Sequence, residues 1–533
     1  MGIHSDRPGE PESLALRYRR RGEAYARRNE PARAVECFTR ALEHLPDAAD
    51  LLLSRSIAFS GAGRRAEALG DLERLLSLHP DHDDARLQRV LTWLEDSPPE
   101  EAIADLNGLI ERHPDEDMHH YTRGLVYARR GSLALAVVDF TTVIQRQKDA
   151  LPSRIERAEA FRRLGEYRSA LRDLDDAVRQ FPHSALLWKL RAIVHTEDGH
   201  PERAMTDLDT SLRLDCQQGP VWRLRADLFR LLGDDSAALE DLRWAIVHGE
   251  RNAPTLRSRA QSLLALHRTA EALNHLHEGL MLDPADVPSL VLRGTIRRDQ
   301  RQWAGAIEDF SAALEPDPTN LSALRRRGQS RASLGDFAGA IDDLSAAIAL
   351  APDHPETWLE RATAHQMLQD TDRAYRDLEE ALRLAPDGFA AWVLRANLNA
   401  MEGHPGLAVA DYERANLIEP NHPGVLNILA WIRATCPDEE FRSGPQAMAC
   451  AAKVCDLCDP IPLDYRDTLA AACAEVGDFG EAIMLVEELL DECDPIPPEY
   501  LARLELYRQR TPCRCEISSD QQMAKLPMVH IEL

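Results

Sequence analysis

An internal period of 34 residues is the feature that most constrains how this chain can fold. Twelve successive blocks of this length run from Ala15 to His422 without an insertion or a deletion. Position 20 of every block is alanine, and position 8 is Gly, Ala or Ser in eleven of the twelve, with Val90 as the exception. Position 32 is proline in nine blocks. A fixed period of this size predicts stacked repeats, each of which contacts only its neighbours.

Each block contains two helical patterns. Apolar or small residues stand at positions 4, 8 and 11, as in Trp222, Ala226 and Phe229, and again at positions 20, 24 and 27. Spacings of three and four residues place such side chains on one face of an α-helix. A glycine or polar turn, such as that around Gly233, separates the two patterns, and proline ends the second. Small residues at positions 8 and 20 predict a closely packed helical hairpin, which a larger side chain would overpack.

Position 7 is arginine in all twelve blocks, and position 23 is aspartate in ten, with Cys37 and His275 as the exceptions. We interpret these residues as a structural ladder of ion pairs, because a partly desolvated guanidinium needs a carboxylate partner. The alternative is that the arginines bind an acidic ligand. The pattern leaves open whether each pair forms within one repeat or across to the next. The arginines are Arg21, Arg55, Arg89, Arg123, Arg157, Arg191, Arg225, Arg259, Arg293, Arg327, Arg361 and Arg395, and the aspartates are Asp71, Asp105, Asp139, Asp173, Asp207, Asp241, Asp309, Asp343, Asp377 and Asp411.

Composition narrows the possible functions. The net charge of −26 argues against non-specific binding of nucleic acid or anionic membranes by the whole surface. No apolar run is long enough for a transmembrane helix, and the first residues lack the apolar core of a signal peptide, so we expect a cytoplasmic protein. Motifs for nucleotide binding, metalloprotease or serine hydrolase chemistry are missing, and we predict no catalytic residue, cofactor or metal. Eight of the ten cysteines follow residue 430, and we expect them to be reduced and to pack as small apolar groups.

The regular rhythm ends after His422. An insertion, "CPDEEFRSG", delays the second helix of the next repeat, in which Ala447 takes position 20, and a further repeat has Ala470 and Ala482 at positions 8 and 20. We expect a last amphipathic helix to cover the open end of the stack. The predicted divisions are a disordered tail over 1–14, twelve repeats over 15–422, a divergent repeat over 423–462, a terminal repeat over 463–496, a capping helix over 497–510 and a C-terminal tail over 511–533.

These motifs resemble the tetratricopeptide repeat (TPR) family, and in particular its long bacterial arrays. The 34-residue length, the small residue at position 8, Ala at 20 and Pro at 32 carry the resemblance, whereas Arg at position 7 departs from the usual Leu. The resemblance implies an all-α, right-handed α-solenoid of stacked hairpins, and it implies that Leu at position 7 would cost little stability. It also implies that positions 2, 5, 9, 12 and 13 line a concave groove. The Lys at 5 and Asn at 9 of the chaperone-binding subclass do not occur together in any block.

The resemblance implies a non-catalytic scaffold that binds an extended or helical segment of a partner protein in this groove, and we expect a monomer. The groove positions of repeats four to ten carry an excess of basic residues over the acidic Glu159, Glu197, Asp227 and Asp299, which favours an acidic peptide segment as the partner. The alternative is that the excess of basic residues arose by chance on a surface that carries both charges. The basic residues are Arg129, Arg162, Arg163, Lys189, Arg223, Arg230, Arg257, Arg298 and Arg325.

Two other functions stay open. The chain could be an accessory or adaptor subunit of an enzyme or secretion complex, which is a scaffold with one specified partner. It could also be an RNA-binding helical-repeat protein, since hairpins of nearly this length can read one base per repeat. The acidity of the chain and its 5% content of aromatic residues argue against RNA, and we expect neither nucleic acid nor membrane as a partner.

Overall fold

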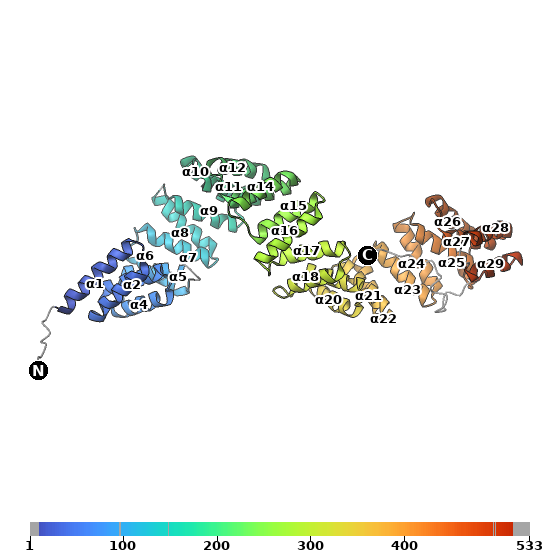
Figure 1. The fold of residues 1–533 in the computed structure, drawn as a ribbon, viewed down its shortest axis with the longest axis horizontal. Coiled ribbons are helices and arrows are strands. Elements are labelled where there is room, and N and C mark those ends of the chain that lie inside the picture. Colours follow the sequence, from blue (N-terminus) through green and yellow to red (C-terminus); the bar gives the residue numbers. More distant parts are fainter. Residues whose placement is uncertain (1–9, 95–97, 148, 494, 496, 515–533) are drawn as a thin grey trace, which may run out of the picture. The chain divides into compact units, whose positions relative to one another are not determined.

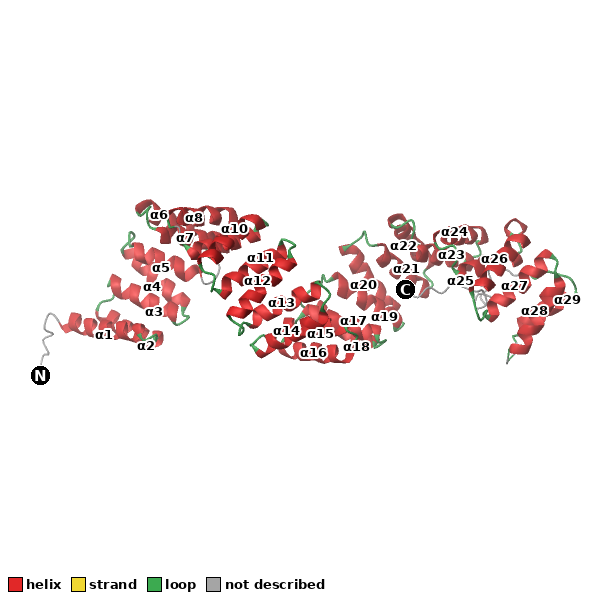
Figure 2. Ribbon diagram, turned by 90° about the horizontal axis from the view of Figure 1, so that it is seen from above, coloured by secondary structure: helices red, strands yellow, loops and turns green. Residues whose placement is uncertain are grey.

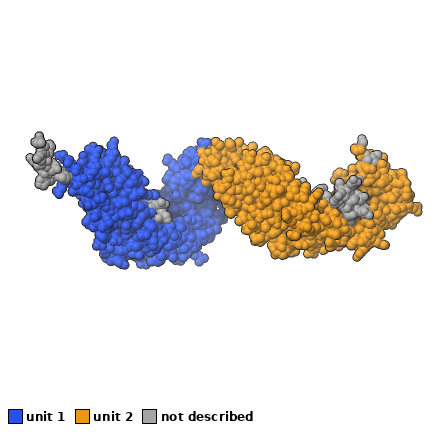
Figure 3. Space-filling model, turned by 90° about the horizontal axis from the view of Figure 1, so that it is seen from below, with its two compact units in different colours: residues 1–251 blue, residues 252–533 orange. Residues whose placement is uncertain are grey.

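The computed structural model describes residues 10–94, 98–147, 149–493, 495 and 497–514. Within these ranges the chain forms 29 α-helices and one 3₁₀ helix, and no strand (Figure 2). The all-α solenoid predicted from the period is therefore confirmed. The chain divides into two compact units, residues 1–251 and 252–533 (Figure 3). None of the helices in the described ranges combines the length and hydropathy needed to cross a membrane.

In both units, helices that follow one another in the chain pack side by side (Figure 1). The helices of the first unit are α1 (Glu10–Arg27), α2 (Pro31–His44), α3 (Ala49–Gly61), α4 (Arg65–Leu78), α5 (Asp83–Leu94), α6 (Glu100–Arg112), α7 (Asp117–Arg129), α8 (Leu133–Arg146), α9 (Leu151–Arg163), α10 (Tyr167–Gln180), α11 (Ala185–Glu197), α12 (Pro201–Leu214), α13 (Gly219–Leu231) and α14 (Asp235–Val247). Those of the second unit are α15 (Ala253–Ala265), α16 (Thr269–Leu282), α17 (Val287–Asp299), α18 (Trp303–Leu314), α19 (Leu321–Ser333), α20 (Phe337–Leu350), α21 (Pro355–Met367), α22 (Thr371–Leu384), α23 (Phe389–Met401), α24 (Pro405–Ile418), α25 (Pro423–Thr435), η1 (Glu439–Phe441), α26 (Gly444–Leu457), α27 (Leu463–Val476), α28 (Phe479–Glu492) and α29 (Pro498–Arg508).

The turn inside each repeat follows from local sequence, as the hairpin of α13 and α14 shows. Gly233 has a φ of +80°, a left-handed conformation that glycine adopts without the steric penalty of a side chain. The carboxylate of Asp234 then accepts a hydrogen bond from the backbone N–H of Ala237 and caps α14. The glycine and the aspartate together end one helix and begin the next within four residues.

Close contact between the two helices of a repeat depends on the small residues. All twelve alanines at position 20 are fully buried. At position 8, a Cβ placed on Gly124 would lie 2.6 Å from the ring of Phe140, and Gly22 and Gly294 stand in the same relation to a phenylalanine. A glycine at position 8 therefore accompanies a phenylalanine at position 24 in these three repeats, because the ring fills the space of a side chain.

The two ends of the chain differ in part from the predicted divisions. Residues 10–14 belong to α1, so the predicted N-terminal tail over 1–14 is too long. Pro11, the second residue of α1, is tolerated there because the first N–H groups of a helix have no intrahelical partner. Residues 1–9 and 515–533 lie outside the described residues. Of the predicted C-terminal tail, residues 511–514 follow α29 without regular structure, and Arg514 donates to the carbonyl of Ala434 and to Glu475.

The C-terminal part of the second unit contains η1 and the helices α25 to α29. The insertion after α25 contains η1, and Ala447, Ala470 and Ala482 are each fully buried. The last helix, α29, packs on α28 through a core that includes Leu504 and Tyr507. This helix covers apolar surface that the preceding repeat would otherwise expose to water.

Candidate binding surface

Ten of the position-7 arginines form ion pairs with the position-23 aspartate of the same repeat. In the hairpin of α13 and α14, the Nε and Nη2 atoms of Arg225 donate to the two carboxylate oxygens of Asp241 at 2.7 and 2.8 Å. The pairs that were predicted as a ladder are Arg191–Asp207, Arg225–Asp241, Arg327–Asp343, Arg361–Asp377 and Arg395–Asp411, and the others are Arg55–Asp71, Arg89–Asp105, Arg123–Asp139, Arg157–Asp173 and Arg293–Asp309.

Many of these arginines also donate a hydrogen bond to a side chain of the preceding repeat. The Nη1 atom of Arg225 donates to Asp209 at 2.7 Å, and that of Arg361 donates to Ser345 at 2.9 Å. Both acceptors stand at position 25 of the repeat before. One guanidinium thus joins the first helix of its own repeat to the second helices of two consecutive repeats. The ladder is both an intra-repeat and an inter-repeat structure.

Aromatic residues complete the surroundings of the arginines. The guanidinium of Arg225 lies over the ring of Trp222, 4.9 Å from its centroid, and the indole N–H of this tryptophan donates to the carbonyl of Cys216. The Arg225 side chain is 18% exposed and that of Asp241 is 6% exposed. Burial raises the pKa of Asp241 above its ordinary value, although Arg225 acts in the opposite direction. With its donors engaged inside the protein, Arg225 has little capacity left for a ligand.

The ladder is interrupted where position 23 is not aspartate. Arg21 of the first repeat bonds to Tyr25. In the repeat of α15 and α16, Arg259 faces His275, and the buried Nε atom of Arg259 has no hydrogen-bond partner in the described part of the chain. Burial and the nearby Arg259 lower the pKa of His275, which favours the neutral ring beside the guanidinium.

In the first unit, three of the six predicted basic groove residues form ion pairs with neighbours. Arg162 forms ion pairs with Glu159 and Glu197, and both Arg223 and Arg230 pair with Asp227. The other three predicted basic residues have different surroundings. Arg163 donates to the carbonyl of Ala128, Lys189 is half-buried, and Arg129 is exposed.

In the second unit, Arg257 pairs with Asp286, Arg298 pairs with Asp299, and Arg325 pairs with Glu360. Asp286 and Glu360 stand at positions 34 and 6 of their blocks, which lie outside the positions expected to line the groove. The predicted excess of nine basic over four acidic groove residues is therefore too large, because it leaves out these two carboxylates. Carboxylates from these two further positions neutralise part of the basic charge.

A pocket of about 260 Å³ in the first unit is lined mainly by apolar side chains of α9, α10 and α11. Its lining includes the carboxyl group of Glu156 at position 6 of its repeat, beside Glu159 and Arg162. Burial raises the pKa of Glu156, and the neighbouring Glu159 raises it further. This part of the first-helix surface is therefore not a uniformly basic groove.

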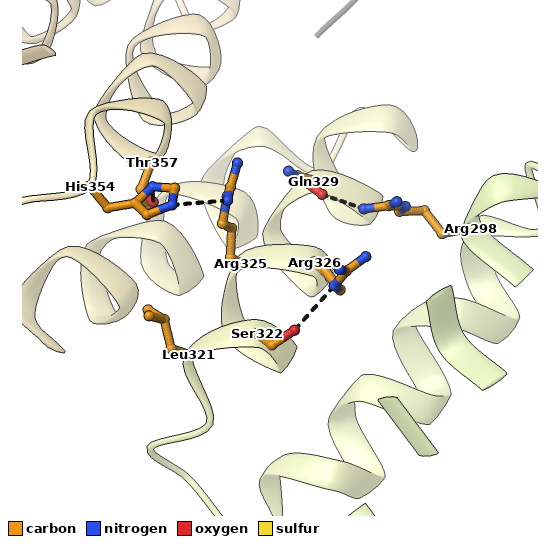
Figure 4. Close-up of a pocket in the computed structure, with 8 residues that line it drawn as sticks. All are labelled: Arg298, Leu321, Ser322, Arg325, Arg326, Gln329, His354 and Thr357. Atoms are coloured by element: carbon orange, nitrogen blue, oxygen red, sulfur yellow. Dashed lines mark hydrogen bonds between the residues drawn. The ribbon is translucent and has the colours of Figure 1, made fainter. Parts of the chain in front are cut away.

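A second pocket, of about 360 Å³, lies entirely within the second unit on α17, α19 and the start of α21 (Figure 4). Arg325, Arg326 and Gln329 project into it from α19, and Arg298 projects from α17. The complete lining is Arg298, Leu321, Ser322, Arg325, Arg326, Gln329, His354 and Thr357.

Two of the three arginines in this pocket are neutralised by carboxylates. The Nη2 atom of Arg325 donates to Glu360 at 2.6 Å, and Gln329 donates to the same carboxylate at 2.7 Å. Arg298 donates to Asp299 and to the side-chain carbonyl of Gln329. Arg326 differs, because within the described residues its one hydrogen bond runs from Nε to the hydroxyl of Ser322, at 3.1 Å.

Sequence reasoning missed Arg326, Glu360 and Glu156, which all stand at position 6. A signal for them was present, since residues at positions 2, 6, 9 and 13 are spaced by four, three and four and share one helix face. Within the described residues, no group of three or more His, Cys, Asp or Glu is arranged to hold a metal ion.

Comparison with known proteins agrees with this architecture. A family model described as tetratricopeptide repeat matches residues 94–151, 155–220, 257–320, 291–355 and 359–423, and a second model with the same description matches residues 15–48. No curated protein matches the chain.

Several solved structures are similar to parts of this chain at low sequence identity. A tetratricopeptide repeat protein from Parabacteroides merdae is 19% identical, with 47% of this chain and 99% of that chain covered and a TM-score of 0.41. YrrB, described as a TPR protein with an unusual peptide-binding site, is 21% identical over 34% of this chain and 95% of its own, with a TM-score of 0.30. The C-terminal part of a TPR repeat-containing protein from Cytophaga hutchinsonii is 14% identical over 44% of this chain and 97% of its own, with a TM-score of 0.38.

Proposed function

Because this chain belongs to the tetratricopeptide repeat family, whose repeats generally mediate contacts between proteins, we propose that it is a non-catalytic scaffold that binds a segment of a partner protein along its first helices. The proposal rests on the observation that arginines at different positions of the repeat have different roles. Ten of the twelve at position 7 are paired inside the ladder, as Arg225 is, whereas polar side chains at positions 5, 6 and 9 line pockets on the first helices.

The arrangement of neighbouring repeats supports this choice of surface. Consecutive first helices contact each other in both units, as α7 does with α9 and α17 with α19. Helices that approach each other across repeats form a continuous face, and their side chains can contact one extended segment at several points. A partner held at several such points would gain specificity from the pattern of charges more than from any single contact.

An accessory subunit of a larger complex would use the same surface, so this alternative differs only in the partner. RNA binding receives less support from the charge distribution. The net charge of −26 and the carboxylates among the first-helix side chains would repel a phosphate backbone.

Site-specific photo-crosslinking tests the proposed surface. Benzoylphenylalanine would replace Lys189 on α11 or Ser322 on α19, and in matched controls it would replace Arg243 on α14 or Ala349 on α20, which are exposed on second helices. Each variant would be expressed in the native organism and irradiated there, and the adducts would be identified by mass spectrometry. We expect the two first-helix probes to capture the same partner and the controls to capture none of it. Capture by the second-helix probes alone would refute the proposed surface.

A further inference from the structure

The pocket on α17, α19 and α21 contains one guanidinium whose binding capacity is unused. We propose that Arg326 receives the carboxylate of a glutamate or aspartate side chain from the partner polypeptide. The proposal rests on the function proposed above and adds the chemical class of group that this pocket takes.

The geometry of the hydrogen bonds singles out Arg326 among the three arginines. Arg325 uses Nε and Nη2 on Glu360 and Nη1 on His354, and Arg298 uses Nε and Nη2 on Asp299 and Nη1 on Gln329. Arg326 uses Nε on Ser322, and within the described residues neither of its terminal nitrogens has a hydrogen bond. Two adjacent N–H groups of a planar guanidinium match the two oxygens of one carboxylate.

The electrostatic surroundings also call for an anion at Arg326. Its guanidinium is half-buried, so water compensates its charge incompletely. Burial lowers the pKa of Arg326 from its ordinary value, and the neighbouring Arg298 lowers it further. Asp299 and Glu360 act in the opposite direction, but neither forms an ion pair with Arg326 in the described ranges, and a carboxylate placed here would offset the cost of burial directly.

The carboxylates around the pocket favour a carboxylate over a phosphate group as the ligand of Arg326. Asp299 and Glu360 pair with Arg298 and Arg325, and a third carboxylate, that of Glu356, lies 3.0 Å from the Nδ1 atom of His354. A phosphate group carries about −1.5 to −2 charges, so these three carboxylates would repel it more strongly than a singly charged carboxylate.

The pocket also has a place for the apolar part of an acidic side chain. Leu321 at the start of α19 is half-buried and lines the same cavity as Arg326. The methylene groups of a glutamate can contact this leucine while the carboxylate reaches the guanidinium, since long polar side chains commonly bury their stems on apolar surface. The volume of about 360 Å³ has room for one side chain.

Immobilised peptide libraries test the proposal with the full-length chain. Each library holds nine-residue peptides with eight randomised positions, and the central residue is fixed as glutamate, glutamine or phosphoserine. We expect the chain to be retained about tenfold more strongly by the glutamate library than by the glutamine library, the size expected for one hydrogen-bonded charge pair. Arg326→Gln should abolish this preference, and Arg326→Lys should keep part of it, because Lys keeps the charge without the planar fork.

The matched control is Arg376→Gln, which removes the same charge from an exposed position of α22. Arg376→Gln should retain the full preference for glutamate. Thermal melting checks the fold of each variant, and Arg326→Gln should melt at or above the temperature of the parent, because it removes a half-buried charge that has no carboxylate partner in the described residues.

The outcomes separate the two proposals. A glutamate preference that survives in Arg326→Gln, or stronger retention by phosphoserine than by glutamate, overturns the carboxylate site and leaves the scaffold function standing. Equal retention by the glutamate and glutamine libraries also overturns the carboxylate site and leaves the scaffold function standing. No retention of the parent chain by any library counts against the scaffold function, and the site proposal falls with it.

Discussion

Replacing Arg225 by leucine should destabilise the chain more than replacing its partner Asp241 by alanine. The family resemblance implies the opposite, because leucine is common at position 7, but the burial of the two side chains decides the order. The Asp241 side chain is 6% exposed, and its hydrogen-bond donors in the described residues are the two nitrogens of Arg225. Arg225→Leu therefore leaves a buried carboxylate without a donor, which typically costs about 3–5 kcal/mol.

Protonation of Asp241 limits the part of this cost that comes from burying an unpaired charge. Adding a proton to a carboxyl group of ordinary pKa 3.9 costs about 4 kcal/mol at pH 7, at 1.36 kcal/mol per pH unit, and about 1.5 kcal/mol at pH 5. Burial already raises the pKa of Asp241 when Arg225 is present. In the leucine variant the folded-state pKa of Asp241 lies further above its unfolded value. The folded state then binds the proton more tightly, and the deficit of the variant shrinks as the pH falls.

Asp241→Ala should cost less, about 1–3 kcal/mol, because Arg225 keeps other partners. Its bond to Asp209 remains, its guanidinium still lies over Trp222, and its side chain is 18% exposed to water. The deficit of this variant should change little between pH 7 and pH 5 relative to the parent. The double variant Arg225→Leu/Asp241→Ala should be more stable than Arg225→Leu alone, since no buried charge is left unpaired.

Hydrogen exchange of the amides in α13 and α14 is the appropriate assay. Repeats are coupled to their neighbours, so a global transition would average the effect over the chain, whereas exchange reports the local opening free energy. Parent, single and double variants would be compared at pH 7 and pH 5 after correction for intrinsic exchange rates. A smaller loss of protection in Arg225→Leu than in Asp241→Ala at pH 7 would refute the reasoning.

Three further predictions concern the core. Gly124→Ala should destabilise its repeat by about 1–3 kcal/mol through overpacking, because the new Cβ would lie 2.6 Å from Phe140, and Phe140→Leu in the same chain should restore most of the loss in thermal melts. Ala374→Leu, at a fully buried position, should cost about 1–3 kcal/mol for the same reason, whereas Ala349→Leu on the exposed face of α20 should be nearly neutral, and equal effects in urea unfolding would show that the assigned helix faces are wrong. Burial lowers the pKa of His365, so the folded state resists its protonation; stability should fall as the pH drops below the ordinary histidine value of about 6.5, and the melting temperature of His365→Phe should depend less on pH between 7 and 5 than that of the parent.

The sequence by itself determined the repeat architecture and the residues that build it. A strict period of 34 with alanine at every position 20 admits one kind of packing, because each repeat must present the same surface to its neighbours. The pairing of Arg225 with Asp241 could also be anticipated, since a half-buried arginine repeated twelve times requires a partner that repeats with it. Periodicity fixes such contacts because they are identical in every repeat.

Only the tertiary structure decided which charges remain available for a partner. The sequence placed Arg325 among nine basic groove residues, but the structure pairs it with Glu360 and leaves Arg326 beside it with Ser322 alone in the described ranges. Arg325 and Arg326 are adjacent in the chain. They differ because Glu360, which lies 35 residues further along the chain on the neighbouring first helix, reaches Arg325. A periodic pattern carries no information on contacts that occur in one repeat only, because these depend on where two particular side chains meet in space.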